Sequence, residues 1–382
     1  MEENDKIEKY MFFYLRTGGG HLAPAKSAAN YIEKTYPNKI KTVLVDGLKE
    51  APFYARFIVE DGYRILQNKA KWYFEFLYGI NKIPGFAKIN SMLVSGRVLP
   101  YIKNQILTEK PDKIVIFHFF LIKPVYKILK EYNLNIPVIT VVTDPYSAHP
   151  VWFLTKEQNI VVFSNKVKKY AQKKKISGKN LHVFDFILDE KYSAPMDNKL
   201  VPVLKEKYGY DITKKMVLIV GGGDGIPRGE KIVKELIKNI DYAEVALVCG
   251  KNKRLFTYAA KLKKKNNYSN LHVYGYVDYI YDLLNISDIV ITKCGASTFM
   301  EILLTGKIPI INDYIWEQEK GNVDYLVENN MGIFEKNINN LPSIIADLIN
   351  KEEYYNFYVN NIKKAKLKNG LQDFCEFIVK FK

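Results

Sequence analysis

A regular alternation of short, β-branched runs with longer amphipathic segments constrains the fold of this chain more than any other feature. Six runs in the first half and five in the second have the length and composition of buried strands. Segments with helical periodicity, such as 25–36 and 230–240, separate them. This alternation predicts βαβ units, parallel sheets and an α/β fold with two doubly wound, Rossmann-like domains. The expected strands are 10–15, 41–45, 113–118, 137–143, 159–163, 182–186, 216–220, 244–248, 271–274, 289–292 and 308–311.

The length of 382 residues also exceeds what one hydrophobic core usually serves. A proline-containing, polar stretch without periodicity at 189–215 marks the boundary. We expect a first domain at 1–188, a second at 189–365 and a C-terminal helix at 366–382 that packs back on the first. Doubly wound domains bind ligands at the carboxyl ends of their strands, so an active site is expected in a cleft between the two.

Other patterns bear on the compartment. The longest apolar run, 114–122, is nine residues, whereas a transmembrane helix needs about 18 or more. The start MEENDKIEKY lacks the basic and apolar regions of a signal peptide. Three cysteines without a CxxC pair fit a reducing cytoplasm and exclude a cysteine-based zinc site.

The positive charge is concentrated in the first half. Of the net +16, residues 1–185 hold a balance of +13, from 29 Lys and Arg against 16 Asp and Glu. A cationic face suggests a polyanionic partner, either nucleic acid or an anionic membrane. Residues 52–101 interleave aromatic and basic side chains, as in a segment that lies among lipid headgroups. An ordinary helical layer with solvated lysines is an equally favoured interpretation.

No RNP, KH or zinc-finger pattern occurs, which favours the membrane over nucleic acid. The second basic run, 166–175, is typical of a solvated helix face.

A glycine-rich loop follows the first expected strand. Gly18, Gly19 and Gly20 allow a ligand to approach the backbone, and a helix is expected to begin at 22–25. His21 then lies beside the positive end of a helix, which favours its neutral form as a base or hydrogen-bond acceptor. The alternative is a tight turn that His21 merely caps.

The second domain opens in the same way, with Gly221, Gly222 and Gly223 after a strand. Neither cluster is a P-loop, and Ile226 stands where GxGxxG needs its third glycine. One such cluster is a weak sign of phosphate binding. Two clusters, one opening each domain, are a stronger sign.

A third segment, KCGAST, again joins a strand to a helix. Its backbone N–H groups, Ser297 and Thr298 suit a diphosphate. Glu301, one turn into the helix, suits ribose hydroxyls, and Gln318 with Glu319 suit the hydroxyls of a sugar. Each of these residues alone is compatible with a cap or a surface group.

In the first domain, Asp144, His149 and Trp152 follow the strand PVITVVT. Asp144 is placed to take a proton from a hydroxyl or to orient a histidine that does. His149 and His118 are each compatible with a satisfied core or loop position, and this interpretation is favoured for His118, which lies inside an apolar run. A zinc site is disfavoured because no HExxH or paired histidine spacing is present.

These segments resemble a known family. TGGGHLAPA (17–25), VVTDPYSAHPVWF (141–153), VLIVGGGDG (217–225), TKCGASTFMEILLTGKIPI (292–310) and EQEKGNVDYL (317–326) are similar, in order, to motifs of one enzyme group. That group is the glycolipid glycosyltransferases related to plant monogalactosyldiacylglycerol synthase and bacterial processive diacylglycerol glucosyltransferases. The resemblance implies a GT-B fold, a UDP-sugar donor on the second domain and a lipid acceptor on the first. It also implies no catalytic metal or other cofactor, and action on the inner face of the cell membrane by a peripherally bound, cytoplasmic protein.

The resemblance also assigns roles. His21 matches the family's essential histidine, Asp144 the aspartate of a TD motif, and His149 with Trp152 an acceptor-side HPxW element. Donor-side matches are Tyr276 and Val277 at the uracil, Glu301 at the ribose, and Gln318 with Glu319 at the sugar. Cys294 departs from the family's usual KPG-type turn. The remaining expected contacts are Gly222, Gly223, Lys293, Gly295, Ser297, Thr298 and Asn322 for the donor, and Gly19 and Gly20 for the acceptor.

The implied reaction is an inverting transfer of galactose or glucose from a UDP-sugar to the hydroxyl of diacylglycerol or a similar lipid, possibly a sterol. Asp144 or His21 would remove the proton, helix N-termini at 222–223 and 296–298 would stabilise departing UDP, and Lys293 would help neutralise the diphosphate. Partners would be the UDP-sugar, the lipid acceptor and an anionic membrane, not nucleic acid.

Two alternatives stay open. One is a UDP-N-acetylglucosamine transfer to a polyprenyl-linked peptidoglycan precursor, although that group usually has paired glutamines at 318–319. The other, more remote, is a basic nucleic-acid-binding protein with purely structural glycine loops.

Overall fold

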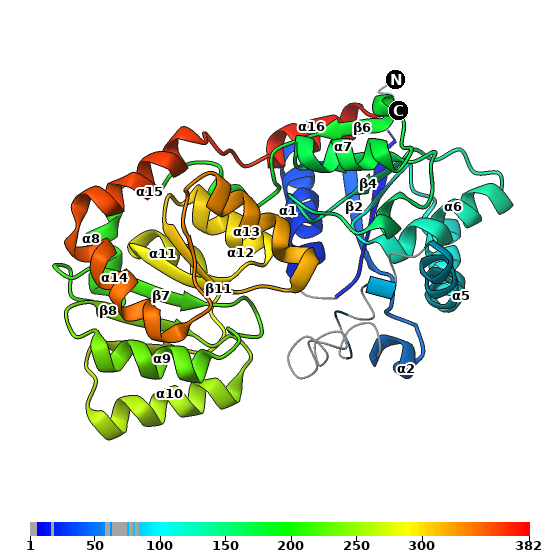
Figure 1. The fold of residues 1–382 in the computed structure, drawn as a ribbon. Helices are drawn as coiled ribbons and strands as arrows, with labels where there is room; N and C mark the ends of the chain where they lie inside the picture. The colour runs from blue at the N-terminus through cyan, green and yellow to red at the C-terminus, as the bar shows by residue number, and fades with distance from the viewer. Residues whose placement is uncertain (1–5, 17–18, 58–61, 63–74, 76–78, 81–83) are drawn as a thin grey trace. The chain divides into compact units, whose positions relative to one another are not determined.

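The computed structural model describes the chain except residues 1–5, 17–18, 58–61, 63–74, 76–78 and 81–83. Most of the 52–101 segment, where we expect membrane contact, therefore lies outside the described residues or their side chains. The described chain divides into two compact units, which Figure 1 shows. Unit 1 comprises residues 1–190 and 369–382, and unit 2 comprises residues 191–368.

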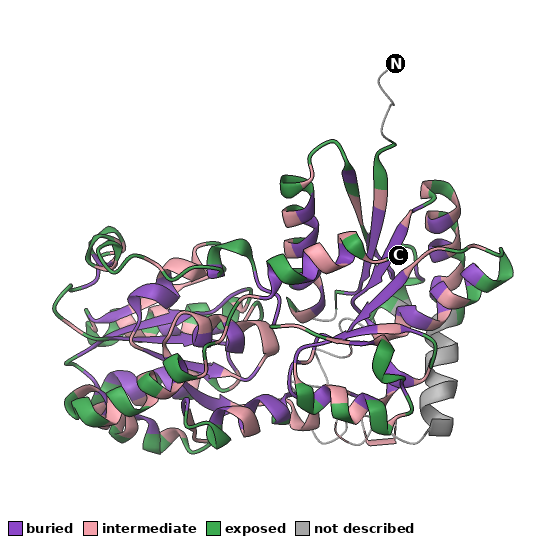
Figure 2. Ribbon diagram, turned by 90° about the horizontal axis from the view of Figure 1, so that it is seen from above, coloured by how far each residue is buried: buried purple, intermediate pink, exposed green. Residues whose placement is uncertain are grey.

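Unit 1 is built on a parallel sheet of six strands in the order β2-β1-β3-β4-β5-β6. Its central strands read as apolar runs because helices cover both faces, as the buried colouring in Figure 2 shows. The strands are β1 Glu8–Tyr14, β2 Ile40–Asp46, β3 Lys113–Ile116, β4 Val138–Val141, β5 Asn159–Val162 and β6 Leu181–Val183. The helices are α1 Gly19–Thr35, α2 Phe53–Arg56, α5 Pro84–Glu109, α6 Ile122–Glu131, α7 Asn165–Lys173 and α16 Leu371–Lys380.

Unit 2 is built on a second parallel six-stranded sheet, in the order β12-β11-β10-β7-β8-β9. Its strands are β7 Met216–Val220, β8 Glu244–Val248, β9 Leu271–Tyr274, β10 Ile289–Lys293, β11 Ile308–Asp313 and β12 Ile333–Phe334. Its helices are α8 Leu200–Lys207, α9 Gly229–Asn239, α10 Lys253–Asn266, α11 Ile280–Ile286, α12 Ala296–Leu304, α13 Trp316–Glu328, α14 Leu341–Asn350 and α15 Glu352–Lys364.

The two doubly wound sheets confirm the predicted fold class, and all eleven expected strands are present with ends that shift by a few residues. The sequence analysis missed β12, which is only two residues long and half-buried. The start of α1 was also wrong. The helix begins at Gly19 rather than at 22–25, so Gly19, Gly20 and His21 form its first turn.

The strand orders define one switch point in each sheet. In unit 1 the chain leaves β1 toward β2 on one side and β3 on the other. The switch point of unit 1 therefore lies between β1 and β3. In unit 2 the chain leaves β7 toward β8 on one side and β10 on the other, so the switch point lies between β7 and β10. Because all neighbouring strands are parallel, the loops after these strands meet at one edge of each sheet, where doubly wound folds bind ligands.

The C-terminal helix α16 packs against α1 in unit 1. The Lys113 ammonium donates to the carbonyls of Ile378 (2.5 Å) and Val379 (3.1 Å), which ties the end of the helix to the start of β3. Gly370 is required before α16, because a Cβ there would meet the Asp185 carbonyl oxygen at 2.0 Å. Within the part of the chain that the structure describes, no helix has both the length and the hydropathy to cross a membrane.

The glycine loop of unit 2 yields a paired prediction. A Cβ at Gly221 would meet the Gly225 carbonyl oxygen at 2.3 Å, whereas a Cβ at Gly223 would meet nothing within 4 Å. We expect Gly221→Ala to lower the free energy of unfolding by about 1–3 kcal/mol, the usual cost of overpacking. Gly223→Ala should leave it within about 0.5 kcal/mol of the parent. Chemical denaturation of both variants checks this, and equal losses would contradict the packing argument.

Candidate functional site

The first candidate site lies at the switch point of unit 1. His21 is the third residue of α1, the helix that follows β1, and its side chain is buried. Its Nδ1 lies 2.7 Å from the carbonyl oxygen of Phe117, just past the end of β3. It also lies 3.0 Å from Oγ1 of Thr143, which follows β4. The ring is therefore held by the loops of three adjacent strands.

These contacts determine which ring nitrogen carries hydrogen. A carbonyl oxygen only accepts, so Nδ1 of His21 must donate to Phe117, and the Nε2 lone pair remains available in the neutral ring. Burial lowers the pKa of His21 to about 4, and the bond to the Phe117 carbonyl only partly opposes this shift. The ring is thus neutral near pH 7, as its position at a helix N-terminus also favours.

Two further histidines surround this ring. The His118 ring meets the His21 ring edge-on, with centroids 4.5 Å apart. Its Nδ1 accepts from the backbone N–H of Phe120, so His118 caps a short helix and is buried and hydrogen-bonded, in agreement with the satisfied position that the sequence favoured. His149 is also buried and accepts at Nδ1 from the Val151 N–H, which caps the next short helix. Both rings therefore carry hydrogen on Nε2 when neutral.

The expected acceptor residues lie at the same sheet edge. The Trp152 ring is completely buried, with its centroid 6.4 Å from that of His21. Its indole Nε1–H has no hydrogen-bond partner among the described residues. Asp144 is half-buried in the loop after β4, adjacent to Thr143. Gly19 and Gly20, in the first turn of α1, have open space at the Cβ positions.

The second candidate site is the switch point of unit 2. The Lys251 N–H donates to the Gly223 carbonyl (2.8 Å), and the Gly250 N–H donates to the Gly275 carbonyl (3.2 Å). These bonds join the loops after β7, β8 and β9. Gly222 has a left-handed φ of 82°, and neither it nor Gly223 has an atom within 4 Å of the Cβ position. The loop therefore exposes backbone that a ligand can approach closely.

The N-terminus of α12 lies after β10, the neighbour of β7. It has no side-chain cap, so its first N–H groups are available to an anion. The Ser297 Oγ and the Asn322 Oδ1 are buried without hydrogen-bond partners among the described residues. Asn322 is held in place because its Nδ2 donates to the Cys294 carbonyl at 2.9 Å. Ser297, Thr298 and Asn322 thus come together around one turn.

Lys293 and Glu319 form an ion pair that the sequence analysis did not predict. The Lys293 Nζ lies 3.0 Å from the Glu319 Oε1. The Glu319 Oε2 accepts from the Ile315 N–H at 2.7 Å, which closes the start of α13. Burial alone would lower the pKa of Lys293, but the Glu319 carboxylate outweighs it and the pKa is raised. A Cβ at Gly295 would meet the Lys293 Nζ at 2.9 Å, so Gly295 makes room for this pair.

The other expected donor residues lie at the same edge of the unit 2 sheet. Glu301 is half-buried in the second turn of α12, and Gln318 is half-buried in the first turn of α13. Tyr276, which is exposed, and Val277 lie in the loop after β9, two strands from β7. Both carboxylate oxygens of Glu319 are engaged within the protein, by Lys293 and by the Ile315 N–H.

Some contacts were missed by sequence reasoning. The Phe117 carbonyl has no sequence signal, because it is backbone about one hundred residues from His21. Thr143 is part of the TD pair, but only the aspartate was considered. Among the described residues, no cluster of three or more His, Cys, Asp or Glu side chains is arranged to hold a metal ion.

Comparisons with known proteins agree with this arrangement. Residues 21–185 match the family model of monogalactosyldiacylglycerol (MGDG) synthase, and residues 216–374 match the glycosyltransferase family 28 C-terminal domain. Monogalactosyldiacylglycerol synthase 1 of Arabidopsis thaliana is 27% identical over 363 residues, covering 90% of this chain and 65% of that protein. Processive diacylglycerol beta-glucosyltransferase of Staphylococcus aureus (strain MRSA252) is 25% identical, covering 94% and 89%. The chain thus spans about two thirds of the length of the plant relatives.

Solved structures show the same fold. UGT71G1 of Medicago truncatula, complexed with UDP-glucose, has a TM-score of 0.62 at 12% identity and covers 99% of this chain and 100% of that one. Anabaena Alr3699/HepE in complex with UDP-glucose has a TM-score of 0.59 at 12% identity, covering 97% and 98%. Two parallel sheets with these strand orders are the GT-B architecture. The chain thus has a GT-B fold whose first half matches MGDG synthase and whose second half matches the glycosyltransferase family 28 C-terminal domain.

Proposed function

We propose that this protein transfers galactose or glucose from a UDP-sugar to the hydroxyl of diacylglycerol or a similar membrane lipid. The observation that carries the proposal is the match of residues 21–185 to MGDG synthase, since this range contains His21, Asp144 and Trp152 of the unit 1 site. The named relatives are a galactosyl-lipid synthase and a diacylglycerol glucosyltransferase, which supports the same acceptor class here.

In the proposed reaction, the Nε2 of His21 takes the proton from the acceptor hydroxyl as its oxygen attacks the anomeric carbon. The bond from that carbon to the diphosphate oxygen breaks, and UDP leaves with the electron pair. Inversion at the anomeric carbon follows from this single displacement. Asp144, next to Thr143, is the second group at this edge able to accept a proton. His21 suits the role because its neutral form and fixed Nδ1–H leave Nε2 basic near pH 7.

We propose that unit 2 holds the donor. The exposed backbone of Gly222 and Gly223 and the uncapped start of α12 would bind the diphosphate through N–H groups. Ser297 Oγ would donate to a phosphate oxygen, and Lys293 would add positive charge. Such preorganised groups stabilise the charge of the leaving UDP, a role that a metal fills in other enzymes. Glu301 would bind the ribose and Gln318 the hexose, with Tyr276 and Val277 at the uracil.

The acceptor is a lipid, so the proposal places the protein peripherally on the inner face of the cell membrane. The balance of +13 over residues 1–185 supports attraction to an anionic surface. Phe53 is 82% exposed, and its ring stacks on that of Phe57 with centroids 6.1 Å apart. Exposed aromatic rings beside basic residues favour a membrane over nucleic acid as the partner.

A lipid-extraction assay tests the proposal. The purified protein is incubated with diacylglycerol in anionic-lipid micelles and with labelled UDP-galactose or UDP-glucose in separate reactions. We expect label in the organic phase from one donor, and a decrease of about 10²–10⁴-fold for His21→Ala. No lipid labelling from either donor would refute the acceptor, and failure to bind UDP as well would refute the whole proposal.

Substitutions at two buried threonines distinguish a positioning role at His21 from a general effect on stability. Thr143 bonds His21, while the equally buried Thr140 in β4 donates to Gln158 at 2.8 Å. We expect Thr143→Val to lower kcat about 2- to 10-fold, the effect of one lost hydrogen bond, without changing KM for the donor. Thr140→Val should lower stability but leave kcat unchanged. Equal effects of the two substitutions on kcat would show that Thr143 has no positioning role.

A further inference from the structure

Unit 2 contains a cavity of about 90 Å³ that lies away from the proposed donor site. It lies where α11 ends and where the turn after α12 leads into β11, so it is at the amino ends of the strands. The glycine loops are at the carboxyl ends, the opposite edge of the same sheet. One wall comes from residues 192–201, the segment that follows the boundary between the two units. One water needs only about 10–15 Å³ of such space, so the cavity has room for a larger group.

Lys307, in the turn before β11, lies in the wall of this cavity. Its Nζ donates to the Asn285 carbonyl at 2.6 Å, at the end of α11. An ammonium group has three N–H donors, so this bond satisfies only one of them. No carboxylate lies within 4.0 Å of Lys307 among the residues that the structure describes. The side chain is therefore a largely buried cation without a paired anion.

The surrounding charges do not balance it. Asp288 is the acid that acts on Lys307, but its Oδ1 pairs with Lys215 at 2.9 Å and its Oδ2 accepts from the Met216 N–H at 2.9 Å. Lys205 and Lys215 contribute further positive charge. Burial, followed by these two lysines, lowers the pKa of Lys307 to about 8, although Asp288 opposes the shift. Burying an unpaired charge is costly, and a bound anion would remove that cost.

We propose that this cavity binds a small oxyanion of the phosphate class, with Lys307 as its counter-charge. Tyr281 and Asn198 also lie in the wall, and their side chains carry a hydroxyl and an amide. The cavity lies at the opposite edge of the sheet from the glycine loops, so the site is distinct from the one proposed for UDP-sugar. Because residues 192–201 form part of the wall, an occupied site holds the start of unit 2 against α11.

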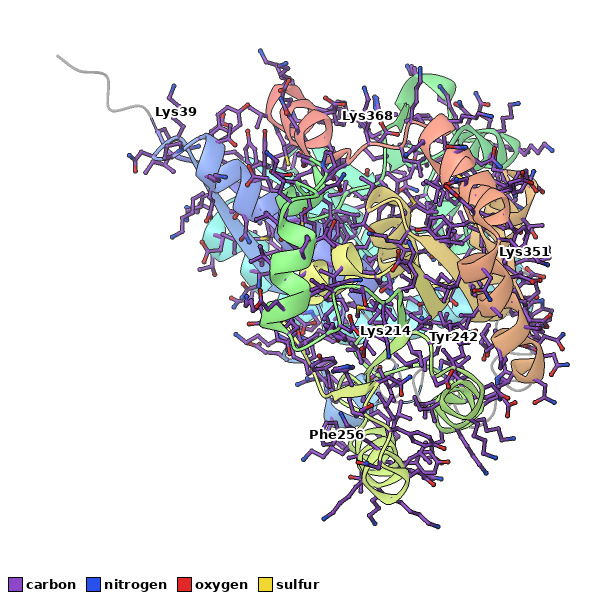
Figure 3. All side chains as sticks on the ribbon, turned by 90° about the vertical axis from the view of Figure 1, so that its left-hand side faces the viewer. Lys39, Lys214, Tyr242, Phe256, Lys351 and Lys368 are labelled. Atoms are coloured by element: carbon purple, nitrogen blue, oxygen red, sulfur yellow. The ribbon has the colours of Figure 1, made fainter. Side chains whose placement is uncertain are left out.

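Labelling of Lys307 tests the proposal on the unmodified protein. The chain is treated with limiting acetic anhydride at about pH 8, with and without inorganic phosphate, and acetylation is read at the Lys307 peptide by mass spectrometry. An anion favours the ammonium form, and a pKa raised by one unit reduces the reactive neutral fraction about fivefold. We expect that protection at Lys307 and none at Lys261, an exposed residue of α10. Figure 3 shows this helix at the surface of unit 2, where it carries Phe256.

Unchanged labelling in phosphate, or the same protection from chloride at equal ionic strength, would overturn the proposal. An arm with glycerol 3-phosphate distinguishes a phosphate ester from the free ion. The readout is confined to one peptide, so phosphate bound at the glycine loops does not affect it, and the result is independent of whether the proposed transferase activity is correct.

A substitution gives a second measurement. Phosphate should raise the Tm of the parent and of Lys261→Met, but the part of this shift due to the cavity should be absent in Lys307→Met. An equal shift in all three proteins would contradict a site at Lys307. If Lys307→Met does not fold, the labelling experiment on the parent still decides the question.

Discussion

The hydrogen bond from the His21 ring to the Phe117 carbonyl is the interaction on which the unit 1 site depends. It joins the helix after β1 to the end of β3, the two strands at which the sheet changes direction. Since the carbonyl only accepts, one bond fixes the ring orientation and the tautomer together. Burial then keeps the ring neutral. The neighbouring side chains of His118, Thr143 and Trp152 pack around a ring whose tautomer and protonation state are already determined.

Unit 2 has the same kind of switch point in a parallel sheet, but its proposed role is to bind a diphosphate. In the proposed reaction a departing diphosphate carries negative charge, and the switch point between β7 and β10 would offer it backbone N–H groups, Ser297 and Lys293 instead of a base. Glycine is needed there for packing as well as for access, because Gly221 fits against the Gly225 carbonyl and Gly295 makes room for Lys293. The ion pair with Glu319 holds the Lys293 ammonium beside the turn, where the proposed diphosphate would meet it together with the hydrogen-bond donors.

Local patterns in the sequence predicted the strands well, because buried parallel strands form continuous apolar runs. They predicted β12 and the start of α1 poorly. A two-residue strand has no periodicity, and Gly19 and Gly20 are weak helix formers that take helical geometry only in this context. Residue types at strand ends predicted His21 and Ser297 as candidates, and the family resemblance added Asn322, but neither predicted their partners. The contact with Phe117 spans 96 positions, and the engagement of Glu319 by Lys293 depends on two neighbouring strands meeting at one edge.

The central claim is that His21 is a neutral base whose hydrogen is on Nδ1 and whose Nε2 is unprotonated. Nitrogen NMR of the ring in the parent protein tests this claim most directly. A pKa of about 4 means that the neutral form dominates above that pH. The account predicts a neutral ring with hydrogen on Nδ1 from about pH 7 down to about pH 5, and protonation only below that range. A ring that is already protonated near pH 7, or that carries its hydrogen on Nε2, would contradict the account.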